Sequence, residues 1–313
     1  MVEKDGFEFT KILYPFNQEN ALRIEVGKHS VADYVAYINE HQIEQALIAM
    51  PDLDFLSECP SLKYLRIGMP STKTKNYDFS PIYNLPEVRS LAVVSEVCIL
   101  NLFKMEEIPA IDYSRVKGMV ALSVTANHGS KNYESISSLK SLRIGGYTNK
   151  AKDLRGMFTS KQLDTLCLLE CKELSLDGIE VSEKLQYLDI SYNRSLRDIS
   201  ALRKVKHSLK ALQIHNCSKI EDFSVLGELT NLESLIIFGN NKLPDLYFLK
   251  NLKKLTRFVF EVTIENGDLT PCLDIPYVAS LRHKRYYNVK VNDLPKGPFL
   301  KGNEDIEEWR RLE

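Results

Sequence analysis

LQYLDISYN (residues 185–193), LKALQIHNC (209–217) and LESLIIFGN (232–240) are three copies of one pattern, L-x-x-L-x-L-x-x-N/C. The copies begin 24 and then 23 residues apart. Self-similarity at such a period indicates repeats that stack into a solenoid, because a single repeat cannot bury its own apolar face. We therefore predict an array of stacked repeats, and we number the places of each repeat from its first leucine.

The apolar places of the repeat predict one short strand per copy. Alternation puts the residues of places four and six on one side of the strand and those of places three, five and seven on the other. Stacked copies then form a parallel sheet with the leucines inside. The ninth place, occupied by Asn193, Cys217 and Asn240, is expected to turn inward, where Asn can bond to backbone groups and Cys fits as a small buried residue.

A second signal follows five residues after each ninth place. Asp198, Asp222 and Asp245 each begin the sequence Asp-apolar-x-x-apolar, and Asp there suits the start of a short turn or helix on the opposite, convex side. Together the two signals resemble the leucine-rich repeat superfamily, in particular the short repeats of bacterial internalins and of a nuclear regulatory subunit of protein phosphatase 1. The resemblance implies an α/β leucine-rich repeat solenoid: a curved right-handed coil with about ten parallel strands on its concave face and short helical, 3-10 or irregular returns on its convex face.

The repeat can be followed through most of the chain, which divides it into three predicted regions. Residues 1–42 do not scan as repeats, and strand-like alternation at 7–13 and 21–27 with a helix from Ser30 predicts an N-terminal cap. Residues 43–264 form the array, with longer returns at 71–77 and 97–114 that we interpret as surface insertions. The pattern then stops, and residues 265–313 are predicted to be a C-terminal cap or tail with a short amphipathic end at 303–311. The ten predicted strands begin near residues 43, 62, 88, 119, 139, 163, 185, 209, 232 and 255.

The composition is that of an ordinary soluble protein. Of 313 residues, 44% are hydrophobic and 27% charged, with a net charge of −1, so there is no bulk attraction to nucleic acid or to an anionic membrane. The N-terminal residues include Glu3 and Asp5 and lack the apolar core of a secretory signal, and no apolar run is long enough to span a membrane. We expect a cytoplasmic protein that is a monomer on its own and needs no cofactor or metal.

No set of residues in the sequence proposes catalysis, since the phosphate-binding, zinc-protease and serine-hydrolase motifs are absent. The six cysteines lack close CxxC pairs. Cys171 and Cys217 occupy ninth places two repeats apart, roughly 10 Å at strand spacing and too far for a disulfide. One enzyme alternative stays open: Cys272-Leu273-Asp274 matches the Cys-x-Asp motif of the ubiquitin-ligase domain that certain bacterial effectors join to leucine-rich repeats, although those domains are much larger than the segment that follows here.

A basic and aromatic run at residues 282–290 is a second alternative site. Its arginines, lysines and tyrosines could hold phosphates and stack on bases. Because the chain as a whole is neutral, we interpret the run as a solvated surface of the C-terminal cap.

The predicted binding surface consists of the outward places of the later repeats. Places three, five and seven project from the concave sheet, and toward the C-terminal half they combine aromatic and aliphatic bulk with a few polar groups, as protein interfaces do. The alternative is that a cap or a loop covers them. The candidate partner-binding residues are Leu169, Tyr187, Asp189, Tyr192, Gln213, His215, Ile236, Phe238, Val259 and Glu261.

The sequence therefore predicts a non-catalytic scaffold whose concave face binds a protein partner. Two versions remain open. One is a regulatory subunit of a larger enzyme, and the other is a stoichiometric inhibitor or immunity-type protein, as in the ribonuclease-inhibitor branch of the superfamily. The mixed charge of the outward places does not choose between them.

Overall fold

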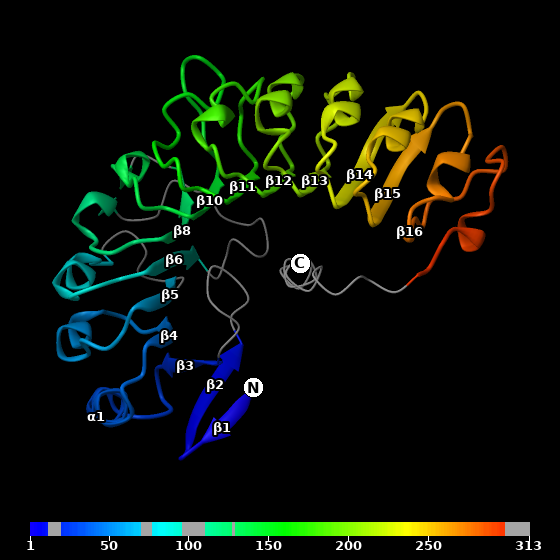
Figure 1. Ribbon diagram of the computed structural model, residues 1–313. Helices are drawn as coiled ribbons and strands as arrows, with labels where there is room; N and C mark the ends of the chain where they lie inside the picture. The colour runs from blue at the N-terminus through cyan, green and yellow to red at the C-terminus, as the bar shows by residue number, and fades with distance from the viewer. Residues whose placement is uncertain (12–19, 70–76, 96–109, 127–128, 298–313) are drawn as a thin grey trace. The chain divides into compact units, whose positions relative to one another are not determined.

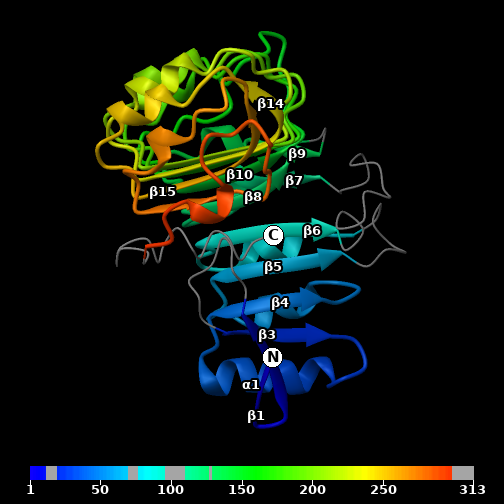
Figure 2. The same cartoon turned by 90° about the vertical axis from the view of Figure 1, so that its right-hand side faces the viewer.

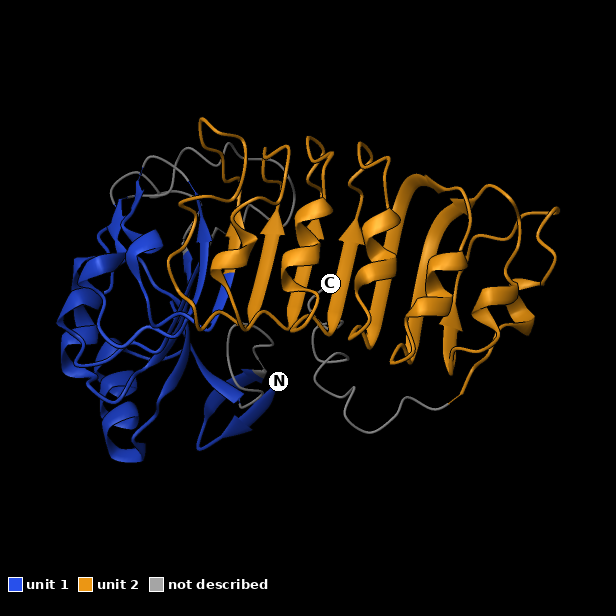
Figure 3. Ribbon diagram, turned by 45° about the horizontal axis from the view of Figure 1, so that its top comes forward, with its two compact units in different colours: residues 1–142, 311–313 blue, residues 143–310 orange. Residues whose placement is uncertain are grey.

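The computed structural model describes residues 1–11, 20–69, 77–95, 110–126 and 129–297, which belong to two compact units (Figure 3). Unit 1 covers residues 1–142 and unit 2 covers residues 143–310. The predicted amphipathic end at 303–311 and most of both predicted insertions lie outside the described residues. Within the described part, no helix is long and apolar enough to cross a membrane.

Unit 1 begins with three antiparallel strands and continues as a parallel sheet. The strands β1 and β2 pair antiparallel, as do β2 and β3, whereas β3 pairs parallel with β4, and every later pair in the order β3-β4-β5-β6-β8 is parallel (Figures 1 and 2). A separate parallel pair, β7 and β9, joins two returns. The strands are β1 (Val2–Lys4), β2 (Phe7–Lys11), β3 (Asn20–Glu25), β4 (Gln45–Ala49), β5 (Tyr64–Met69), β6 (Ser90–Ser95), β7 (Ile111–Asp112), β8 (Ala121–Thr125) and β9 (Ser130–Lys131).

The helix α1 (Val31–His41) lies beside β3 in unit 1 (Figure 2). It begins with a capping box, in which Ser30 accepts from the backbone N–H of Asp33 and the Asp33 carboxylate accepts from the backbone N–H of Ser30. Its apolar side packs inward, and the ring of Tyr37 stacks on Phe7 of β2 with centroids 4.0 Å apart. The predicted helix start is thus present, and the predicted strands at 7–13 and 21–27 correspond to β2 and β3, although residues 12 and 13 lie outside the described residues. Their role as a cap stays a prediction.

Unit 2 is a row of strands, parallel from β11 to β16, and a short 3-10 turn lies in each return from β11 onward (Figures 1 and 3). All ten predicted strands are present in the chain. Four of them lie in unit 1, β10 spans residues on both sides of the division at 142, and five lie in unit 2. The strands are β10 (Ser141–Gly145), β11 (Thr165–Leu169), β12 (Tyr187–Ser191), β13 (Ala211–His215), β14 (Ser234–Leu243), β15 (Arg257–Ile264) and β16 (Tyr277–Ala279).

The prediction that the pattern stops after the tenth strand was wrong. The strand β16 pairs parallel with β15, with Arg257 opposite Tyr277 and Val259 opposite Ala279. The turn before it has the same construction as its predecessors, because Asp268 accepts from the backbone N–H of Thr270 at 3.0 Å and η12 (Thr270–Cys272) follows. The repeat that contains β16 was missed in the sequence because Pro276 and Ser280 interrupt its pattern of apolar residues, although Val278 is fully buried.

The core of unit 2 lies between the sheet and the 3-10 turns. Places one, four and six are buried in each clean repeat, and the predicted Asp turns are present: Asp198, Asp222 and Asp245 each accept from the backbone N–H two residues later at 2.8 Å. A carboxylate that accepts this bond fixes the first turn of the return. The turns that follow are η9 (Ser200–Val205), η10 (Ser224–Glu228) and η11 (Tyr247–Asn251).

The inward ninth place was predicted correctly in two repeats and wrongly in the third. Asn193 is buried, donates to Leu168 O at 2.9 Å and accepts from the backbone N–H of Cys171. In the third repeat Asn240 is exposed and Asn241 is the buried residue. A bulge explains the shift: the ladder between β14 and β15 slips between Phe238 and Lys242, and Gly239 has a φ of 136°.

Candidate functional site

The candidate site is the sheet face of unit 2, by which we mean the side of β11–β15 that carries places three, five and seven. In-register pairing of the five strands aligns equal places into ladders that run across the sheet. The place-five ladder is Cys167, Asp189, Gln213, Ile236 and Val259, and the place-seven ladder is Leu169, Ser191, His215, Phe238 and Glu261. Nine of the ten predicted binding residues therefore lie on one face, and the tenth, Tyr192, follows the end of β12.

Half of the predicted binding residues are buried, contrary to the expectation that they meet water. The buried ones are Tyr187, Gln213, His215, Ile236 and Val259, each 8% exposed or less. Parallel strands lie only about 5 Å apart, so a large side chain in a ladder is covered by its neighbours on the adjoining strands. For example, Tyr187 packs with Cys167 and Ala211 of the two neighbouring strands in a small apolar cluster.

The residues that remain open concentrate toward the carboxyl ends of the strands. Leu169, Asp189, Phe238 and Glu261 are partly exposed, and Tyr192 is 43% exposed. Two of these open groups are held by described neighbours. The Phe238 ring lies against the His215 ring with centroids 4.9 Å apart, and Asp189 accepts from the hydroxyl of Ser191.

The eighth place of the repeats is a left-handed turn that fixes this edge of the sheet. Gly146, Glu170, Tyr192, Asn216 and Gly239 all have positive φ. The first four each donate the backbone N–H to the place-seven carbonyl of the next repeat, at distances from 2.7 to 3.0 Å. The backbone N–H of Tyr192 is therefore hydrogen-bonded to the next repeat while its side chain is open, a combination that the sequence did not predict.

The alternative catalytic group, Cys272, is fully buried in η12. Burial raises the pKa of its thiol to about 12. The thiolate is the nucleophilic form of cysteine, and it is scarce at neutral pH when the pKa is this high. The structure therefore gives no support to Cys272 as a nucleophile.

The basic and aromatic run at 282–290 uses both of its tyrosines for packing against the end of β15. Tyr287 is buried and its hydroxyl accepts from Ile264 N at 3.2 Å, while the Tyr286 hydroxyl donates to Ile264 O at 3.3 Å. The two rings meet edge to face, with centroids 5.2 Å apart. The Tyr287 ring is therefore part of the fold, whereas the Tyr286 ring is 53% exposed.

No cluster of three or more His, Cys, Asp or Glu side chains that could hold a metal occurs among the described residues. The cysteines described, which are Cys59, Cys167, Cys171, Cys217 and Cys272, are all free and buried. Cys98 lies outside the described residues.

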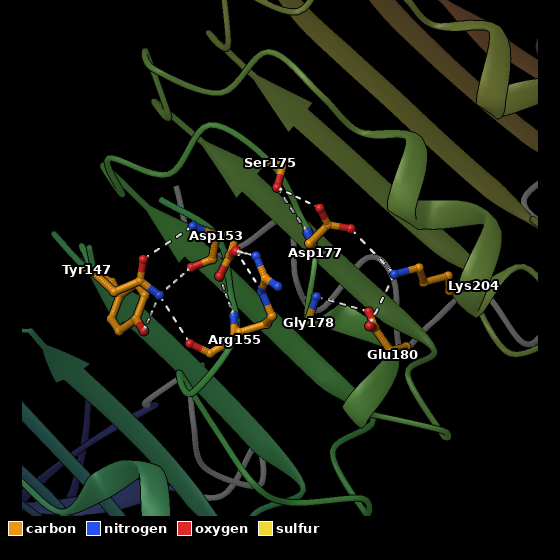
Figure 4. A network of polar contacts seen from close by, with 9 residues as sticks. Tyr147, Asp153, Arg155, Ser175, Asp177, Gly178, Glu180 and Lys204 are labelled. Atoms are coloured by element: carbon orange, nitrogen blue, oxygen red, sulfur yellow. Dashed lines mark hydrogen bonds and ion pairs between the residues drawn. The ribbon is translucent and has the colours of Figure 1, made fainter. Parts of the chain in front are cut away.

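One polar network in unit 2 was not predicted from the sequence. Asp153 pairs with Arg155 within the return after β10, the backbone N–H of Leu154 donates to Asp177 O of the next return at 2.8 Å, and Lys204 of the return after that pairs with Asp177 at 3.4 Å and Glu180 at 3.1 Å (Figure 4). Beside it lies Glu173, which is 3% exposed. No repeat place marks this glutamate in the sequence, because the returns differ in length and residue pattern. The sequence shows only the charged pair Lys172-Glu173 between the inward residues Cys171 and Leu176, without a sign of which of the two is buried.

The chain was compared with known proteins. No protein-family model matches it, and neither does any curated protein. Among solved structures it is similar to an internalin of Listeria monocytogenes, with 18% identity and a TM-score of 0.48 over 77% of this chain and 73% of that one. It is also similar to a leucine-rich repeat protein of Leptospira interrogans, with 16% identity and a TM-score of 0.49 over 80% of this chain and 65% of that one. A third similar structure is the functional domain of InlJ from Listeria monocytogenes, with 17% identity and a TM-score of 0.48 over 75% and 56% of the two chains.

The fold follows from the repeat geometry of the chain itself. Parallel strands recur at the L-x-x-L-x-L places, Asn193 and Cys217 turn inward at the ninth place, and an Asp turn precedes each 3-10 return of the clean repeats. The chain is a leucine-rich repeat solenoid. In such a fold the inward places are dictated by stacking, whereas the open places of the sheet face are not.

Proposed function

We propose that this leucine-rich repeat chain is a non-catalytic scaffold that binds a protein partner with the sheet face of unit 2. The observation that carries the proposal is the open edge of that face, where Leu169, Tyr192 and Phe238 stand beside the acidic Asp189 and Glu261. Aromatic residues with fixed positions and a few polar neighbours are the usual anchors of protein interfaces. Stacking of the repeats does not require these side chains, which supports a role in recognition.

The structure divides the predicted residues by role. Open residues are the ones a partner could touch, with Phe238 and Tyr192 as anchors because the first rests on His215 and the second has a fixed backbone. Buried residues such as Tyr187 and Ile236 lie on the same face and pack beside the open ones. Both a regulatory subunit and a stoichiometric inhibitor would use such a surface, and both remain versions of this proposal.

The test begins with affinity purification of a partner by the intact chain, followed by measurement of its affinity for variants. We expect Phe238→Ala and Tyr192→Ala each to weaken binding by about tenfold or more, because loss of an interface anchor typically costs over 1 kcal/mol. The matched control is Tyr247→Ala, which removes an aromatic side chain that is 50% exposed on the opposite side of the repeat, in η11. If both sheet-face variants keep full affinity while their circular dichroism and melting stay normal, the assignment of the surface is wrong.

A further inference from the structure

Glu173 is an enclosed carboxyl group that ties the returns of two neighbouring repeats together. One of its oxygens, Oε1, accepts from the backbone N–H of Asn149 at 3.1 Å. The other, Oε2, is buried and has no hydrogen-bond partner among the described residues. The backbones run side by side here, since Lys172 N donates to Tyr147 O at 2.9 Å and Leu174 N donates to Lys152 O at 2.8 Å.

Asn149, which Glu173 holds, organises the loop formed by residues 147–155. Its side-chain amide donates to Asp153 O at 2.9 Å and to Arg155 O at 3.1 Å, and its side-chain oxygen accepts from Asp153 N at 3.3 Å. The loop continues into the network drawn in Figure 4, where Asp153 pairs with Arg155. The bond from Glu173 to Asn149 is therefore a side-chain link between this loop and the following repeat, beside the backbone hydrogen bonds made by Tyr147, Lys152 and Leu154.

The charged groups around Glu173 do not neutralise it. On the facing loop, the Asp153 carboxylate is engaged by Arg155, and the ammonium group of Lys152 donates to the Thr148 hydroxyl. On its own return, Cys171 is a buried neutral thiol whose pKa is raised to about 12 by burial.

In the next return, the backbone N–H groups of Arg197 and Asp198 donate to the carbonyl of Leu174, the residue after Glu173. The charged side chains of Arg197 and Asp198 are exposed. Burial, reinforced by Asp153, raises the pKa of Glu173 to about 7, while the Asn149 N–H and Lys152 act in the opposite direction.

We propose that Glu173 is a proton-operated latch for the loop 147–155. The protonated carboxyl is neutral, so it can remain enclosed and keep Asn149 bound. Release of its proton to water leaves a buried charge whose Oε2 lacks a donor, and an enclosed charge without a partner is strongly unfavourable. The carboxylate then turns toward water, the bond to Asn149 is lost, and the turn that the Asn149 side chain organises opens more often, although the backbone bonds of Tyr147, Lys152 and Leu154 to the following repeat remain. The latch is independent of the sheet-face proposal, because it concerns the loop and not the partner.

The test measures hydrogen exchange of the backbone amides of residues 147–155 in the full chain from pH 5.5 to 8.5. Protection factors are used, because they remove the chemical pH dependence of exchange. In the unmodified chain we expect protection of this loop to fall by about tenfold or more across that range, with a midpoint near the pKa of the buried carboxyl. In Glu173→Gln, whose side chain stays neutral, protection should stay constant. The matched control is Glu170→Gln, an exposed glutamate three residues away, which should titrate like the unmodified chain.

A second variant keeps the proposal testable if Glu173→Gln does not fold. Lys152→Met removes the cation that lowers the pKa of Glu173, so the loop should open at a higher pH than in the unmodified chain. Loop protection that is constant with pH in the unmodified chain would overturn the latch, as would an unchanged midpoint in Lys152→Met or a persistent pH dependence in Glu173→Gln.

Discussion

At the scale of single residues, the ninth place shows how one side chain can close a repeat. A buried Asn there bonds to backbone groups of the preceding repeat, as Asn193 does with Leu168 O and the N–H of Cys171. Asn241 does the same with Cys217 O at 3.0 Å and Ile220 O at 2.9 Å. Backbone groups buried at a bend need such partners because water cannot reach them.

The adjacent pair Asn240 and Asn241 allows a sharp test of this role. We expect Asn241→Ala to lower the free energy of unfolding by roughly 1–3 kcal/mol, because it removes the side-chain donor that two buried carbonyl groups share. Asn240→Ala should change it by less than about 0.5 kcal/mol, since that side chain is exposed. Urea denaturation of both variants gives the measurement. A larger loss of unfolding free energy in Asn240→Ala than in Asn241→Ala would contradict the bulged register of β14.

At the scale of elements, the strands could be predicted from the sequence because each depends on local, repeated information. Apolar residues at places one, four and six bury the same side of each strand, and this holds even where the returns are irregular. The bulge in β14 could not be predicted from the sequence, because either Asn240 or Asn241 could occupy the ninth place. The backbone conformation of Gly239 decides which of the two turns inward. Burial of half the candidate site was also missed, since it depends on side chains of adjoining strands and not on the strand itself.

The bulge itself predicts a strong preference for glycine at residue 239. Its φ of 136° is a conformation that residues with a Cβ rarely adopt, and an added Cβ would lie 3.2 Å from the Cα of Asn216. We therefore expect Gly239→Ala to cost roughly 1–3 kcal/mol of stability. Gly227→Ala is the control, because φ at that position is ordinary and the nearest atoms to an added Cβ are 3.4 Å away on side chains. Equal melting temperatures for the two variants would show that β14 does not need this turn.

At the scale of the whole molecule, the candidate site belongs to a face assembled from five strands. Each ladder residue has neighbours on both sides, so the surface a partner would meet is defined only when adjoining repeats are folded. Stability of a repeat array is approximately a sum of repeat and neighbour terms. The sheet face should therefore be complete only while all the repeats of β11–β15 are folded. It is lost in a single step if unit 2 unfolds cooperatively.

The buried cysteines of unit 2 report directly on that cooperativity. Burial raises the pKa of Cys171, Cys217 and Cys272 to about 12 and raises that of Cys167 further, so alkylation at pH 8 requires that the local repeat unfold first. We expect brief pulses of iodoacetamide at increasing urea concentrations, read by mass spectrometry, to modify all four cysteines at one common midpoint. Modification of Cys272 well before Cys167 would instead show that the last repeat unfolds separately. Rapid modification of Cys272 without urea would contradict its burial and restore the case for a reactive thiol.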